Sequence, residues 1–146
     1  MPRILAVDWG ERRIGLAVCD PTGTIATGLE TLKVRSPSEA PAQVAAVAGA
    51  VEAESIVVGL PLLLSGDRGS AAEAAERFAA ALRETSGLPV DTWDERLTSA
   101  LAERRMHERG ERTGRRKARV DEGAAVALLE SWLARLAARA RDAERA

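Results

Sequence analysis

The sequence has very few of the residues that build disulfides, zinc sites and aromatic binding surfaces. It contains one cysteine, Cys19, and one histidine, His107, among its 146 residues. A single cysteine excludes a disulfide within the chain, and the two residues together provide too few ligands for a typical zinc site. Aromatic side chains make up only 3 % of the chain, and tyrosine is absent. A surface that stacks many nucleotide bases is therefore excluded.

The chain also lacks a long apolar run, although 46 % of its residues are hydrophobic. No stretch reaches the roughly 18 consecutive apolar residues that a membrane span needs. The first residues lead to an acid at Asp8, which is unlike a secretory signal, so we expect a cytoplasmic protein that contacts no membrane. At roughly 150 residues per domain, the length predicts one domain over residues 1–146.

An overall excess of charge is missing too, since the formal net charge is −1. Residues 1–94 carry 8 basic and 13 acidic side chains, whereas residues 95–146 carry 13 basic and 9 acidic ones. Eight basic residues, against two acidic ones, fall within segment 104–119. Most of them are arginine, whose planar guanidinium suits phosphate, so this segment is a candidate contact for nucleic acid. A solvated helix and loop is the plain alternative.

The hydrophobic pattern predicts strands and helices in the order β-β-β-α-β-α-β-α-α. Short connections join the first three strands, and helices separate the later ones. We therefore expect an α/β fold with a mixed five-stranded sheet, in which parallel crossover strands extend an antiparallel meander and helices cover the faces. The expected strands are Arg3–Asp8, Arg13–Cys19, Thr24 to about Val34, Ser55–Pro61 and Pro89–Trp93.

Capping signals mark the expected starts of two helices. Ser36 with Glu39, and Ser70 with Glu73, have the spacing of a capping box. The second of these helices is expected to end at Gly87, because glycine is common just beyond a helix.

The last third of the chain predicts two more helices with a loop between them. Thr98 or Ser99 begins the first, which extends to about Glu108, and Asp121 opens the second. The intervening Gly110–Arg119 is basic and has no apolar periodicity, so it is predicted as a mobile loop.

Acidic residues stand where two buried strands end. Asp8 closes the first strand, Asp94 and Glu95 follow the last strand, and Asp121 could bring a further acid to the same place. In a sheet whose strands 1, 4 and 5 run parallel, these strand ends share one edge, where ligands bind in open α/β sheets. Carboxylates without a Cys or His cluster favour Mg²⁺ or Mn²⁺ over zinc. Two such ions about 3.5–4 Å apart can promote hydrolysis of a phosphodiester.

Four linked motifs resemble those of the YqgF family, also called the RuvX-like family. They run in order over nearly the whole chain, so together they are specific, although each alone would be weak. The family comprises bacterial nucleases of the RNase H-like superfamily. The resemblance implies an RNase H-like fold and metal-dependent hydrolysis of phosphodiesters. The motifs are Asp8–Asp20, Val57–Pro61 with Gly66, Trp93–Thr98 and Lys117–Ala125.

The resemblance also implies roles for individual residues. The catalytic and metal-binding acids of the family fall on Asp8, Glu95 and Asp121, with two Mg²⁺ or Mn²⁺ ions as the expected cofactor. The main function implied is processing of the 16S ribosomal RNA precursor at its 5′ end. Their basic character, rather than the resemblance, marks the residues expected to contact nucleic acid, which are Arg12, Arg13, Arg96, Arg115, Arg116, Lys117 and Arg119.

Three alternative functions remain open from the sequence. A Holliday junction resolvase acting on branched DNA would use the same chemistry, and it would usually be a homodimer because it cuts two strands symmetrically. A non-catalytic ribosome-assembly factor would keep the fold but would not need the three acids. An actin-like ATPase shares an Asp-x-Gly sequence after its first strand, but it needs two such domains, and this chain has the length of one.

Other conspicuous residues have plainer interpretations. Trp9 and Trp93 adjoin the acids, and we expect them to pack in the core rather than to stack on bases. Asp20 is expected to start a turn, Cys19 to fill a small buried space, and His107 to lie on the surface.

Overall fold

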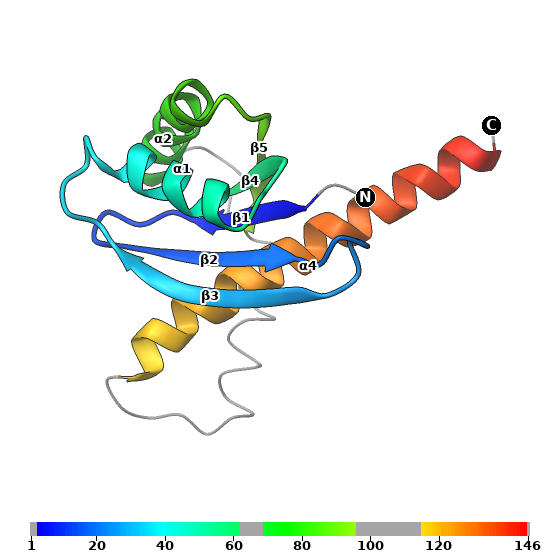
Figure 1. Cartoon of the computed structure of the whole chain (residues 1–146), viewed down its shortest axis with the longest axis horizontal. Helices are drawn as coiled ribbons and strands as arrows, with labels where there is room; N and C mark the ends of the chain where they lie inside the picture. The colour runs from blue at the N-terminus through cyan, green and yellow to red at the C-terminus, as the bar shows by residue number, and fades with distance from the viewer. Residues whose placement is uncertain (1–2, 62–68, 96–114, 146) are drawn as a thin grey trace.

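The computed structural model describes residues 3–61, 69–95 and 115–145, and Figure 1 shows their arrangement. Its five strands form one sheet in the order β3-β2-β1-β4-β5. Strand β2 is antiparallel to β1 and β3, whereas β4 is parallel to both β1 and β5. The expected mixed sheet is therefore confirmed. The strands are β1 Ile4–Asp8, β2 Arg13–Cys19, β3 Ala26–Lys33, β4 Ser55–Leu60 and β5 Val90–Asp94.

Helices cover both faces of the sheet (Figure 1). Helices α1, Ala40–Ala50, and α2, Ser70–Ser86, lie on one face, and α4, Arg115–Arg145, crosses the other. No helix in the described part of the chain is long and apolar enough to cross a membrane.

Alternating side chains of β1 divide the core between these two layers. Leu5 and Val7 pack in the cluster that includes residues of α1 and α2. Ile4 and Ala6 pack in the cluster that includes Leu128 and other residues of α4. Because successive side chains of a strand point to opposite faces, β1 is buried on both sides, as its unbroken apolar run predicts.

The two predicted capping boxes are not formed. Helix α1 begins at Ala40 and has no side-chain cap, while the carboxylate of Glu39 pairs with Arg35 at 3.5 Å instead of capping the helix. Helix α2 has the extended Gly69 at its N-cap position, so Ser70 is already its first helical residue. The predicted end of α2 is confirmed, since Gly87 adopts a left-handed φ of 70°.

The predicted start of the last helix at Asp121 is also wrong, because α4 begins at Arg115. The part of the expected basic loop that covers residues 115–119 is therefore helical. Arginine, lysine and alanine have high intrinsic helix propensity, so this segment can extend a helix although it has no apolar periodicity. Residues 110–114 and the expected helix from Thr98 or Ser99 to about Glu108 lie outside the described residues, as does His107.

Candidate active site

The carboxyl ends of three parallel strands meet at one edge of the sheet. In the register of β1 and β4, Val7 pairs with Val58, and in that of β4 and β5, Gly59 pairs with Trp93. The end of β4 therefore separates Asp8, at the end of β1, from Glu95, which directly follows β5. This is the edge at which the sequence predicts a ligand site.

The side chains of Asp8 and Glu95 nevertheless meet, because the residue between them is glycine. A Cβ atom on Gly59 would lie 2.5 Å from Oε1 of Glu95 and 2.8 Å from its Cγ. Both distances are shorter than a normal van der Waals contact, so any larger residue would displace Glu95. Because Gly59 has no side chain, the Glu95 side chain can occupy the space above it and reach Asp8.

The protonation of Asp8 depends strongly on its surroundings, which include Glu95. Burial, followed by a hydrogen bond with Glu95 and by the charge of Glu95, raises the pKa of Asp8 well above its ordinary value of 3.8. Two carboxylates in contact cannot both ionise without a large cost, so they hold a proton between them or need a cation. The pair therefore has the chemistry of a cation site.

The available ligands fit a hard cation. Within the described ranges, no group of three Asp, Glu, His or Cys side chains comes together. The two that meet are both carboxylates, and oxygen ligands of this kind suit Mg²⁺ or Mn²⁺ better than zinc. Asp121 lies on α4, one helical turn before Ala125, which is buried against the sheet. The side chain of Asp121 lies outside the described residues.

A polar contact joins the strand that leads to Glu95 with the helix that carries Asp121. The indole Nε1 of Trp93 donates a hydrogen bond to Oγ of Ser131 at 2.8 Å. The rings of Trp93 and Trp132 meet edge to face, with centroids 5.4 Å apart. Trp93 therefore packs in the core, as expected, and it fixes the end of β5 against α4.

Glu95, rather than its neighbour Asp94, is the acid that meets Asp8. Asp94 is the last residue of β5 and pairs in register with Leu60. Alternation along the strand directs residues 94 and 95 to opposite faces of the sheet. Trp93 packs in the cluster that contains α4, and residue 95 continues on its side.

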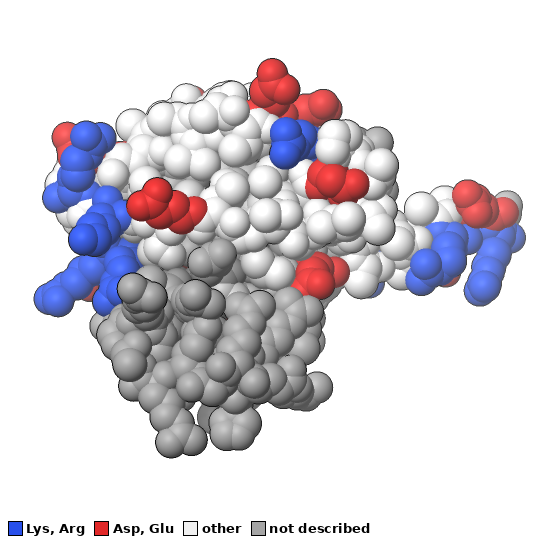
Figure 2. Space-filling model, turned by 60° about the horizontal axis from the view of Figure 1, so that its bottom comes forward, with Lys and Arg blue, Asp and Glu red and all other residues white. Residues whose placement is uncertain are grey.

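The expected nucleic-acid contacts are only partly described. Arg12 is exposed in the turn after β1, and Arg13 begins β2, where it pairs in register with Lys33 of β3. Figure 2 shows basic side chains gathered at this end of the described surface. Arg96 lies outside the described residues. The remaining four, Arg115, Arg116, Lys117 and Arg119, lie on the first turns of α4, and their side chains lie outside the description.

Two residues of this site were missed by the sequence analysis. Gly59 lies within the Val57–Pro61 motif, but no role was predicted for it, although its place inside an apolar strand signals a close approach. Ser131 was not singled out. Its signal is a hydroxyl beside the apolar residues that bury α4.

The fold resembles that of solved resolvases. RuvC of Thermus thermophilus, in complex with a Holliday junction substrate, matches with a TM-score of 0.61 and 18 % identity, over 94 % of this chain and 97 % of that one. Fowlpox virus resolvase, in complex with Holliday junction DNA, matches with a TM-score of 0.57 and 14 % identity, over 92 % and 98 %. At such low identity the likeness concerns the fold alone, and it places the chain among α/β proteins that share this mixed-sheet fold.

Similarity in sequence identifies the family within this class. Residues 2–135 match the RuvX family, described as "Holliday junction resolvase". A relative in Koribacter versatilis is 46 % identical over 133 residues, which cover 91 % of this chain and 87 % of the relative. One in Mycobacterium tuberculosis is 41 % identical over 144 residues, which cover 97 % and 85 %. Both are named "Putative pre-16S rRNA nuclease". The chain belongs to the RuvX family and is a nuclease, as its motifs predict.

Proposed function

We propose that this protein is a divalent-metal-dependent nuclease that processes the 5′ end of the 16S ribosomal RNA precursor in the cytoplasm. The observation that carries the proposal is the meeting of Asp8 and Glu95 at the carboxyl edge of the sheet, with Gly59 leaving room for their contact. The names of relatives that are 41–46 % identical favour the RNA substrate.

The proposed mechanism assigns a task to each group of residues. The carboxylate oxygens of Asp8, Glu95 and Asp121 would hold a pair of Mg²⁺ or Mn²⁺ ions. Bound there, such ions supply the Lewis acidity that activates water and stabilises a leaving oxygen. Without them, the raised pKa of Asp8 favours its protonated form beside Glu95. The side chains of Arg12 and Arg13 would bind phosphates that flank the bond to be cut.

A second candidate is resolution of Holliday junctions. It is supported by the family description and by the resolvase fold. Both substrates are polyanions and would meet the same acids, so the distinction depends on the shape of the bound nucleic acid. Symmetrical cutting of two strands would need two active sites, and hence a homodimer.

A direct competition between substrates tests the proposal. Purified protein would receive a 16S rRNA precursor that includes its 5′ extension, or a four-way DNA junction, each with Mn²⁺ and in parallel with Asp8→Asn protein. We expect faster cutting of the RNA by the unaltered protein and no cutting by the variant. Faster cutting of the junction, together with a dimeric mass from light scattering, would favour the second candidate. No metal-dependent cutting of either substrate would refute both.

A further inference from the structure

A cavity of about 600 Å³ begins on the opposite side of the sheet edge from the acids. Trp9, which directly follows Asp8, lines it together with residues of the β1–β2 turn, the β3–α1 connection and α2. Trp9 packs against the core cluster of α1 and α2, whereas Asp8 lies on the face of α4. Asp8 therefore belongs to the acid pair on the α4 side of the sheet, whereas Trp9 belongs to the cavity on the side of α1 and α2.

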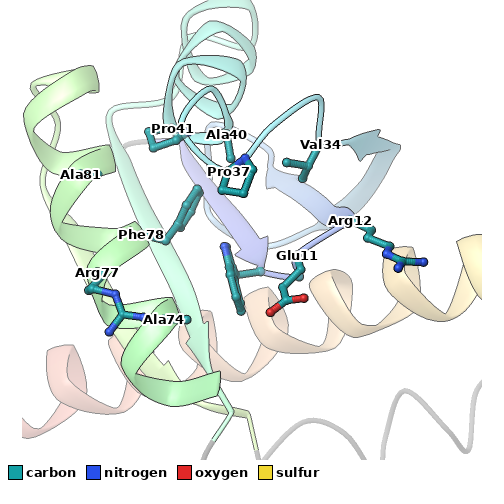
Figure 3. Close-up of a pocket in the computed structure, with 12 residues that line it drawn as sticks. Glu11, Arg12, Val34, Pro37, Ala40, Pro41, Ala74, Arg77, Phe78 and Ala81 are labelled. Atoms are coloured by element: carbon teal, nitrogen blue, oxygen red, sulfur yellow. The ribbon is translucent and has the colours of Figure 1, made fainter. Parts of the chain in front are cut away.

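The walls of this cavity are mainly apolar. Phe78 is only 6 % exposed, and in Figure 3 its ring points from α2 toward Pro37 and Ala40. The small side chains of Ala40, Ala74 and Ala81 line the cavity and leave its space unfilled. The volume lies within the range of about 300–1,000 Å³ that is usual for small-molecule pockets. Two aromatic rings and a space of this size suit a flat aromatic group.

Charged side chains border this apolar space. Arg12 comes from the β1–β2 turn on one side, and Arg77 comes from α2 on the other (Figure 3). Arg13 follows Arg12 in the chain and pairs in register with Lys33 of β3. Glu11 also lines the cavity, and its carboxylate disfavours a free anion inside. The arrangement fits a neutral group in the cavity that is attached to a negatively charged backbone outside.

We propose that this cavity binds one unpaired base of the nucleic-acid substrate, a few nucleotides at most from the bond that is cut. The base enters between Trp9 and Phe78, while Arg12 and Arg77 contact the adjacent phosphates. This inference rests on the proposed nuclease function and deepens it. It implies that the substrate needs an unpaired nucleotide near the cleavage position.

Binding of short RNA without added metal tests the cavity separately from cleavage. The probes are labelled single-stranded RNA oligomers in which one abasic position moves along the chain. Loss of a base that stacks on aromatic rings weakens binding by about 5- to 150-fold. We expect a loss of this size at one position and little effect elsewhere. Equal binding of all the abasic oligomers would overturn the proposal.

Substitutions that fill the cavity provide the matched comparison. Ala81→Leu and, independently, Ala74→Leu place bulk in the cavity, whereas Ala80→Leu adds the same bulk on an exposed part of α2. Each filled variant that melts like the unaltered protein should bind the intact oligomer as weakly as the sensitive abasic one. Ala80→Leu should bind normally. Normal binding by both filled variants, or an equal loss in Ala80→Leu, would refute a base in this cavity.

The two proposals fail in different ways. Suppose that Mn²⁺ supports cleavage, but that neither an abasic position nor a filled cavity changes the affinity for the RNA oligomers. The proposed nuclease function then stands, and the base site is wrong. If an abasic position weakens binding but neither the RNA precursor nor the DNA junction is cut with Mn²⁺, the cavity stands as a nucleic-acid site and the proposed metal-dependent cleavage of these substrates is wrong.

Discussion

Two aspartates at the ends of neighbouring strands have opposite electrostatic surroundings. Asp8 ends β1 beside Glu95, and burial together with that second acid raises its pKa. Asp20 directly follows β2, and hydrogen bonds from the backbone of Ile25, from the Thr22 hydroxyl and from the backbone of Thr24 lower its pKa. Because β1 and β2 are antiparallel, the two residues lie at opposite ends of the sheet.

The difference separates a structural acid from a reactive one. Asp20 finds its partners within its own turn, so its negative charge is already compensated. Asp8 faces the carboxylate of Glu95, so its ionised form needs a bound cation to stabilise it. The position of an acid after a strand is thus not enough to mark a site, and the partners of that acid decide its role.

The largest effect is expected for Asp8→Asn, which removes one of the two carboxylates while keeping its shape. Loss of a residue that merely supports a metal ligand costs about 10–100-fold, so loss of a direct ligand should cost at least about 100-fold in kcat/KM. Steady-state cleavage with Mn²⁺ measures the change. Full activity would show that Asp8, like Asp20, has no role in cleavage.

Gly59→Ala should lower activity by about 10–100-fold while leaving both acids in the sequence, because the new Cβ displaces the Glu95 carboxylate. Gly49→Ala is the matched control, since a Cβ at Gly49 in α1 meets nothing within 4 Å. We expect normal activity and equal or higher thermal stability for that variant, because alanine favours helix. Equal activities of the two variants would contradict the idea that the space at Gly59 positions the Glu95 carboxylate.

Stability without metal should respond to pH through Asp8. Its folded pKa lies above its unfolded pKa, so its contribution is fully present below the unfolded value of about 4 and is lost as pH rises toward the folded pKa. Asp8→Asn cannot lose a proton and should therefore melt higher than the unaltered protein at pH 8, with a smaller difference at pH 4. In a chain of this size, each kcal/mol corresponds to about 2–4 °C in Tm. Calorimetry in a chelating buffer measures it. A variant that melts lower at pH 8 would contradict the raised pKa.

Asp20→Asn should show the reverse pattern and the smallest effect. Its folded pKa lies below its unfolded pKa, so its contribution is present above about pH 4 and is lost as pH falls toward the folded value. The variant should melt slightly lower than the unaltered protein at pH 7, and the two should converge in acid. Cleavage should not change, because the turn lies at the far end of the sheet. A loss of activity comparable to that of Asp8→Asn would end the comparison.

The sequence predicts the sheet well, and it also predicts the positions of Asp8 and Glu95 in the candidate site. Unbroken apolar runs identify β1 and β4, and the short turn at Asp20 requires an antiparallel neighbour. The position of Asp8 and Glu95 at a common edge follows from this topology. The contact between them does not, because it depends on the missing side chain of Gly59 in a third strand.

The start of α2 at Ser70 is predicted correctly, whereas local patterns predicted the starts of α1 and α4 wrongly. Ser36 with Glu39 has the spacing of a cap, but Arg35 attracts the carboxylate away from it. The basic residues after Gly114 have no apolar face, yet their helix propensity and the packing of later turns of α4 carry the helix through them. In both places the outcome depends on interactions that the spacing of residue types does not show.

The parallel arrangement of β1, β4 and β5 has a consequence for the protein during its own synthesis. Asp8 is made early, but its partner Glu95 takes its place only after two crossover connections have folded and β5 has paired. The Trp93–Ser131 bond, which anchors that strand to α4, comes later still. A partly made chain emerges beside ribosomal RNA with its acids still apart. The order of translation itself thus delays assembly of the acid pair until most of the chain has been made.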